Sequence, residues 1–314
     1  HQEHKFEAAM GNMATEVDTK TPRYFEAEVV RVEQVTKSVR DVTVLAEVSR
    51  ELVPLTQAYK QVGQRATVRA AGANGAGAQV PISSAPPPVE VYEESLDRLR
   101  GDIAASDSKV QLEPVSTLTE VTLRVDSARH RALYGLEPGD KVETGPFAGM
   151  GMSFRPMQFI FGYPTVLICA NGEGISSAKA LIECGASDRG LCFHMREAVR
   201  LYQREEQDGS LAYADRHANW ANAYHVDVHP VKRAGGAHAL QDAFDADDLE
   251  YDPDATAAIV FDGGDPGFKM SALKMLNDAG VNPDVIVQAT KDGDAIFLEN
   301  HAVTDDEKRR KGIA

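Results

Sequence analysis

A glycine-rich turn at residues 171–174 has the residue types and spacing to bind an anion. It follows an apolar run that ends at Ala170 and precedes a segment with helical spacing. Such a turn brings backbone N–H groups and the positive end of a helix to one point, where many folds bind phosphate. Here, however, Glu173 lies between Gly172 and Gly174. The turn therefore combines the backbone of a phosphate site with a carboxylate.

The charge of Glu173 opposes such a ligand. Two like charges about 4 Å apart repel by about 4 kcal/mol at an effective dielectric of about 20, which is roughly a thousandfold in affinity. In an alternative interpretation, Glu173 itself accepts hydrogen bonds from the free N–H groups and serves the helix as a built-in anion. In both cases we expect its side chain not to be deeply buried.

A second group of interest is His225-x-Asp227-x-His229, which places three side chains on one face of a strand. Imidazoles with a carboxylate suit zinc. We favour the alternative, a polar outer face on an edge strand, and predict no metal site. Trp220 and Tyr213, at helical spacing, fit packing better than base stacking. The sequence contains no Gly-x-Ser-x-Gly, His-Glu-x-x-His or P-loop motif.

Length and charge limit the classes of function. The chain has 314 residues, enough for two domains, and a formal net charge of −15. That charge argues against nucleic acid and anionic membrane surfaces as partners. The longest apolar stretch, 157–170, is broken by Gly162 and Pro164 and is shorter than the roughly 20 residues of a spanning helix. We therefore predict no membrane span.

The cysteines and the first residue bear on the compartment. Cys169, Cys184 and Cys192 form no Cys-x-x-Cys pair. Cys169 and Cys184 occupy apolar positions, so we expect them in the core, which suits a reducing compartment. The chain begins with His rather than Met, and we expect that a targeting peptide is missing from it.

The N-terminal half reads as a β domain. Residues 1–21 are polar and unpatterned, and we interpret them as an arm. Short segments with alternating and β-branched residues follow between 22 and 156, which favours a small antiparallel β-barrel. Residues 92–118 interrupt this pattern as an insertion, and a glycine-rich loop lies at 70–79.

The C-terminal half reads as an α/β domain. Between residues 163 and 298, apolar strands alternate with segments of helical spacing. This alternation is typical of a parallel sheet with helices on its faces. Residues 165–170 are predicted to form a central strand of that sheet. The charged residues 299–314 follow as a C-terminal tail.

The order of these motifs resembles the ferredoxin–NADP reductase superfamily over about residues 22–295, and within it the plant and algal chloroplast branch that includes a kiwi-fruit protein. The motifs that carry the resemblance are ISSAPP (82–87), YGLEPGDKVE (134–143), GPFAGMGMSF (145–154), the strand–turn–helix at 165–183, VRLYQREEQDGSLAYADR (199–216) and IVFDGGDPGFKMSALKML (259–276). The resemblance implies an FAD-binding-like barrel, an NAD(P)-binding-like α/β domain, and hydride transfer between two cofactors.

The flavin motifs of the superfamily are degenerate here. Its Arg-x-Tyr-Ser motif aligns with Ala78, Val80 and Pro81, which offer no charge, ring or hydroxyl. Ser83 and Ser84 are the nearby groups that could donate to FAD, although turn residues before a proline account for them as well. The usual Gly-x-Ser/Thr aligns with residues 127–129, where Arg129 could replace the lost cation. We therefore keep FAD as a candidate cofactor.

The nucleotide motifs have gained acidic residues. Gly172, Gly174 and Ser176 align with the superfamily's phosphate turn, with Glu173 between the glycines. An arginine that meets the adenosine phosphate is replaced by Glu206, and a cysteine beside the nicotinamide by Asp262. Three carboxylates around one anionic ligand argue against NAD(P) binding. We predict that Glu173, Glu206 and Asp262 block the site.

Two functions follow from this pattern. The first is a pseudoenzyme, a reductase-like accessory or structural subunit of a larger organellar, photosynthetic assembly, with no catalytic residues left. The second is an FAD-dependent NAD(P)H oxidoreductase with atypical cofactor contacts. We expect protein subunits as partners and disfavour ferredoxin, because two acidic proteins lack charge complementarity. The family branch implies the chloroplast, in the stroma or on the stromal face of the thylakoid, with the mitochondrion as the alternative.

Overall fold

The computed structural model describes residues 24–49, 58–92, 97, 101, 116–149, 151–184, 191–289 and 295–297. The predicted N-terminal arm, the C-terminal tail and most of the predicted insertion at 92–118 lie outside these residues.

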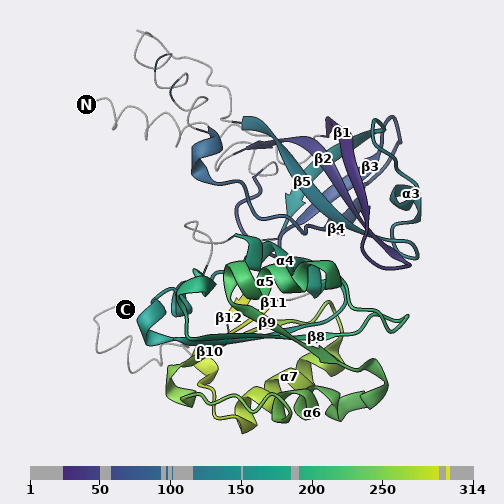
Figure 1. Ribbon diagram of the computed structural model, residues 1–314. Helices are drawn as coiled ribbons and strands as arrows, with labels where there is room; N and C mark the ends of the chain where they lie inside the picture. Colours follow the sequence, from purple (N-terminus) through teal and green to yellow (C-terminus); the bar gives the residue numbers. More distant parts are fainter. Residues whose placement is uncertain are drawn as a thin grey trace, which may run out of the picture.

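The first domain is a six-stranded antiparallel sheet with the order β4-β3-β6-β1-β2-β5 (Figure 1). Its strands are β1 (Phe25–Gln34), β2 (Val39–Ser49), β3 (Arg65–Ala70), β4 (Ala78–Pro81), β5 (Ser116–Asp126) and β6 (Lys141–Ala148). The sheet curls until Ile82, just after β4, pairs with Leu123 of β5. The result is barrel-like, as predicted, although a single bridge rather than a continuous ladder joins the two edges.

The interior of this domain follows from strand alternation. Residues of alternating positions, among them Val29, Val44, Val68 and Val142, form one buried apolar cluster. A short helix, α3 (Arg131–Tyr134), and a 3₁₀ turn, η2 (Val89–Tyr92), complete the domain.

The second domain is a sheet with the order β12-β11-β10-β7-β8-β9. Its strands are β7 (Thr165–Ala170), β8 (Ala198–Arg204), β9 (Val226–Val231), β10 (Thr256–Phe261), β11 (Ile286–Ala289) and β12 (Ala295–Phe297). All neighbours pair in parallel except β11 and β12. Every residue of β7 is buried, because helices cover both faces. The predicted central strand at 165–170 is confirmed.

The helices form two layers on this sheet. They are α4 (Gly174–Glu183), α5 (His217–Tyr224), α6 (Ala239–Asp245) and α7 (Pro266–Asp278). Figure 1 shows α4 and α5 between the sheet and the barrel, with α6 and α7 on the far face. Short 3₁₀ turns join the elements: η3 (Arg155–Met157), η4 (Ile160–Gly162), η5 (Phe193–Met195), η6 (Ala214–Arg216), η7 (Arg233–His238), η8 (Pro253–Ala255) and η9 (Pro283–Val285). None of the described helices is long and apolar enough to cross a membrane.

Candidate functional site: the cleft between the two domains

The glycines of the turn after β7 are required by close packing. A Cβ on Gly174 would lie 2.3 Å from the carbonyl oxygen of Phe261, at the end of β10. A Cβ on Gly263, in the next loop, would lie 2.2 Å from the carbonyl oxygen of Asn171. Gly172 has φ +52, which favours glycine. The two loops therefore interlock at the carboxyl ends of β7 and β10, and packing alone accounts for the glycines.

Glu173 is bound by two arginines of the barrel domain. Arg65 of β3 donates from Nη2 to Oε2 at 2.9 Å, and Arg129, after β5, approaches Oε1 to 2.7 Å. The side chain makes no capping hydrogen bond to the helix, so the built-in-anion interpretation is wrong. Glu173 is also only 8% exposed, contrary to our expectation.

The electrostatics of Glu173 follow from these partners. Burial alone would raise its pKa, but the guanidinium groups of Arg65 and Arg129 outweigh burial and hold the pKa below its ordinary value. The carboxylate is thus ionised, and the two arginines balance its negative charge. Glu173 therefore opposes phosphate binding mainly because it occupies Arg65 and Arg129, which would otherwise pair with the phosphate. Direct repulsion between the two negative charges contributes less.

Glu206, in the loop after β8, bonds a second barrel arginine. Its Oε1 lies 2.5 Å from Nη2 of Arg124, a β5 residue that is 2% exposed. Burial would lower the pKa of Arg124, but the carboxylate of Glu206 raises it. Nε and Nη1 of Arg124 have no hydrogen-bond partner among the described residues. Glu206 is therefore the main partner of a deeply buried cation.

Asp262 and Asp265 organise the loop after β10 and do not reach the barrel arginines. Asp262 accepts a hydrogen bond from the N–H of Gly264 at 2.8 Å, and burial raises its pKa. Asp265 caps α7 through the N–H groups of Gly267 and Phe268. Its second oxygen lies 3.1 Å from Nη1 of Arg204. These two carboxylates are thus satisfied within their own domain.

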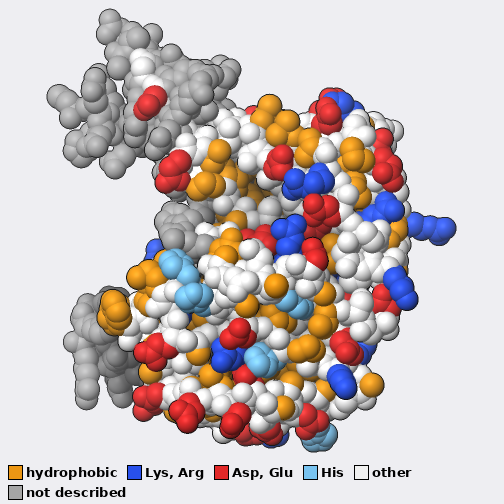
Figure 2. Space-filling model, viewed as in Figure 1, with side chains coloured by type: hydrophobic (Ala, Val, Ile, Leu, Met, Phe, Trp, Pro, Cys, Tyr) orange, Lys and Arg blue, Asp and Glu red, His pale blue; other side chains and the backbone are white. Residues whose placement is uncertain are grey.

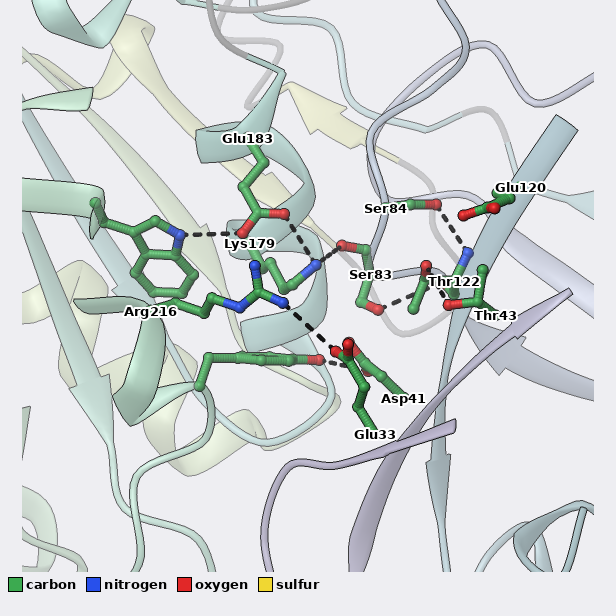
Figure 3. A network of polar contacts seen from close by, with 12 residues as sticks. Glu33, Asp41, Thr43, Ser83, Ser84, Glu120, Thr122, Lys179, Glu183 and Arg216 are labelled. Atoms are coloured by element: carbon green, nitrogen blue, oxygen red, sulfur yellow. Dashed lines mark hydrogen bonds and ion pairs between the residues drawn. The ribbon is translucent and has the colours of Figure 1, made fainter. Parts of the chain in front are cut away.

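Further polar contacts cross the cleft, and Figure 3 shows part of this network. Lys179 of α4 donates to the carbonyl oxygen of Ser83 at 2.9 Å. The hydroxyl of Tyr213 donates to Asp41 of β2 at 2.9 Å. Arg216 lies 3.4 Å from Glu33 of β1. Together with the pairs of Glu173 and Glu206, these contacts join the two domains at several points.

Sequence reasoning missed Arg65, Asp41 and Lys179. The available signal was a charged residue in an apolar setting, such as Asp41 in β2 or Lys179 on the buried side of α4. Burial raises the pKa of Asp41, and the Lys179 ammonium acts in the opposite direction. Burial and then the Asp41 carboxylate raise the pKa of Tyr213 well above its ordinary value. No spacing rule connects these residues, because their partners lie in the other domain.

The predicted serines bond the protein itself. Ser84 Oγ accepts from the N–H of Thr122 at 3.0 Å, and Ser83 is fully buried. Ser176 Oγ donates to the carbonyl oxygen of Glu173 at 2.5 Å. Of the predicted cofactor residues, Arg129, Gly172 and Gly174 do come together around Glu173, while Ser83 and Ser84 close the barrel edge.

Among the described residues, the cavity beside Glu173 is too small for FAD. A cavity of about 30 Å³ lies between Arg65 and Pro81 on one side and Glu173 and Asp262 on the other. That is room for about two water molecules, whereas sites for cofactor-sized ligands measure about 300–1,000 Å³. The arginines that could pair with a pyrophosphate already bind carboxylates.

A larger cavity of about 250 Å³ lies on the side of α6 and α7. Its wall includes Arg204 and Val231 at the carboxyl ends of β8 and β9, Leu240 of α6, and Phe268 near the start of α7. Parallel sheets commonly bind ligands at this end of their strands. The cavity could hold a small ligand or one part of a larger one.

The residues of the suggested zinc group do not converge. His225 follows α5 in a left-handed conformation, Asp227 pairs with Arg200, and His229 pairs with Asp247. Within the described residues, no cluster of possible metal ligands is present.

Trp220 and Tyr213 are buried and pack against each other, as expected. Burial raises the pKa of the Cys169 thiol to about 12.

Comparison with known proteins identifies one curated relative and many similar structures. No family model matches the chain. Over 169 residues, the chain is 28% identical to the fruit protein pKIWI502 of Actinidia deliciosa, and the match covers 52% of this chain and 51% of that protein. The chain therefore spans about half the length of this relative.

The similar solved structures include several reductases. A ferredoxin–NADP⁺ reductase from Plasmodium falciparum aligns with a TM-score of 0.55 at 11% identity, covering 88% of this chain and 98% of that one. A ferredoxin NADP⁺ reductase from Neisseria gonorrhoeae with bound FAD and NADP aligns at 0.52 and 14%, covering 85% and 98%. An Amycolatopsis cytochrome P450 reductase aligns at 0.53 and 17%, covering 86% and 71%. The chain thus has the two-domain fold of ferredoxin–NADP reductase-like proteins.

Proposed function

We propose that this protein is a non-catalytic, reductase-like accessory or structural subunit of a larger assembly. The observation that carries the proposal is the position of Glu173 between Arg65 and Arg129. The carboxylate holds the cations that would meet an anionic cofactor, and the cavity beside it is small. Binding and hydride transfer both need that space, so we expect both to be lost.

Exposed aromatic residues support a role in binding other proteins. Phe159 is 67% exposed and Phe161 is 83% exposed, and the two rings contact each other edge to face. Arg196 holds this segment in place by donating to the carbonyl oxygens of Met157 and Tyr163. Exposed apolar groups on a fixed backbone are typical of interaction sites.

The acidic surface bears on the choice of partner. Figure 2 shows acidic side chains along the lower edge of the sheet domain. Those exposed at α6 and the loop after it are Asp242, Asp245, Asp248, Glu250, Asp252 and Asp254. An acidic protein such as ferredoxin would be repelled there.

From the family branch that the sequence resembles, we propose that the protein lies in the chloroplast, in the stroma or on the stromal face of the thylakoid, with the mitochondrion as the alternative.

The cofactor test uses the purified protein. We expect no flavin absorbance, and no binding of NADH or NADPH tighter than about millimolar by isothermal titration, since each occupied cation withholds a charge-assisted hydrogen bond that is worth about ten- to a hundredfold in affinity. A low-micromolar dissociation constant for either nucleotide would contradict the proposal. Co-migration with a large complex on native gels of organelle extracts tests the subunit role, and migration as a free chain contradicts it.

The alternative is an FAD-dependent NAD(P)H oxidoreductase with atypical contacts. The larger cavity beside Arg204 favours it, because that space could hold part of a nucleotide. The similar structure from Neisseria gonorrhoeae was solved with FAD and NADP. A yellow protein that oxidises NADPH with an artificial acceptor would establish this alternative.

A further inference from the structure

Ion pairs between the sheet domain and the barrel hold the two domains in their relative position. Glu173 joins two different parts of the barrel, because Arg65 belongs to β3 and Arg129 follows β5. Glu206 reaches a third barrel residue, Arg124. One short turn and one loop of the sheet domain therefore grip the barrel through three cations.

The pairs Glu173–Arg65 and Glu206–Arg124 are sheltered from water, so removing one partner costs more free energy than it would at the surface. The side chains of Glu173 and Arg65 are 9% and 13% exposed, and those of Glu206 and Arg124 are 11% and 2% exposed. Removing one partner of a buried pair leaves an uncompensated charge, which costs far more than loss of a surface pair. Opening the cleft separates the partners and replaces their charge-assisted hydrogen bonds by bonds to water, so it loses the net free energy of those pairs.

We propose that Glu173 and Glu206 act as a latch that locks the two domains into one cooperative unit without a ligand between them. The carboxylates supply the negative charge that a bridging anion would otherwise place between the barrel arginines and the sheet domain. The latch is a property of the protein alone, and it goes beyond the question of catalysis.

The test compares the wild type with Glu173→Gln/Glu206→Gln, after each sample is checked for flavin absorbance. The control is Glu143→Gln, which removes an ion pair with Arg69 inside the barrel. We expect one calorimetric unfolding transition for wild type and control, and two for the double variant. In the double variant, amide hydrogen exchange at residues 122–124 and 172–176 should accelerate at least about tenfold, since local opening becomes easier. A single transition with unchanged exchange overturns the latch.

The double variant leaves Arg124 buried without its partner and could fail to fold. Arg65→Gln then decides, because it removes the sheltered pair while Arg129 still balances the charge of Glu173. Exchange at 172–176 that is several-fold faster than in wild type supports the latch, and unchanged exchange overturns it. Bound flavin in the wild type would contradict the non-catalytic proposal and the ligand-free part of the latch, while the variants would still report whether the ion pairs couple the domains. A colourless protein whose domains stay coupled in every variant would contradict only the latch.

Discussion

At the scale of the residue, Glu173 illustrates how a neighbour changes the meaning of a charge. An isolated carboxylate in a phosphate turn repels a phosphate. With Arg65 at 2.9 Å and Arg129 at 2.7 Å, its charge is balanced, and the arginines are no longer available to a ligand. Competition for the two cations is therefore the expected cause of weak binding.

This competition predicts a gain of affinity in Glu173→Thr. Freed from the carboxylate, Arg65 and Arg129 should bind inorganic pyrophosphate about ten- to a hundredfold more tightly than in the wild type, the range expected for a charge-assisted hydrogen bond. Calorimetric titration at low salt measures the difference. Adding Arg65→Met should abolish the gain. If Glu173→Thr is folded but binds pyrophosphate no more tightly than the wild type, the shape of the cleft excludes the anion.

The pair of Arg124 and Glu206 predicts a large loss of stability. Glu206→Ala leaves a guanidinium that is 2% exposed without its carboxylate. We expect a loss of about 3–5 kcal/mol in the free energy of unfolding, measured with urea. Arg124→Met in the same chain should recover more than half of it, because no buried charge remains. A double variant as unstable as Glu206→Ala would show that the unpaired charge is not the cause.

At the scale of the element, the approach of α4 to β10 depends on a missing side chain. A Cβ at Gly174 would meet the backbone of Phe261 at 2.3 Å, and backbone cannot swing aside. We expect Gly174→Ala to lower the free energy of unfolding by about 1–3 kcal/mol, the range for overpacking a core. Gly135→Ala is the matched control, since nothing lies within 4 Å of its Cβ. Equal effects of the two changes in thermal unfolding would refute this reason for the glycine.

At the scale of the whole molecule, local patterns predicted the domains and missed their junction. The apolar run at 165–170 and the helical spacing after it are short-range signals, and both elements formed as expected. Arg65, a partner of Glu173, lies 108 residues earlier in β3, and Arg124, the partner of Glu206, lies 82 residues earlier in β5. Which arginine a carboxylate reaches depends on how two finished domains dock, and no spacing within one element encodes that. Hence the acidic positions were predicted, while their neutralisation was not.

The junction also predicts how stability depends on pH. The pKa of Glu173 is held below its ordinary value of 4.5, so its ion pairs contribute fully above pH 4.5 and are lost as the pH falls through the folded-state pKa. Glu173→Gln should therefore melt below the wild type at pH 7, and the gap should close below pH 4.5.

His130 must be controlled, because Glu173, Arg65 and Asp126 all act on it and burial lowers its pKa. Its effect begins as the pH falls below its ordinary value of 6.5, where protonation favours the unfolded chain. Removing Glu173 strengthens that effect and would widen the gap before it closes. We therefore place His130→Asn in both chains and compare their melting temperatures by calorimetry from pH 7 to pH 3. A gap that stays constant over this range means that Glu173 stabilises the junction through its shape, since a charge contribution has to vanish when the carboxylate is protonated.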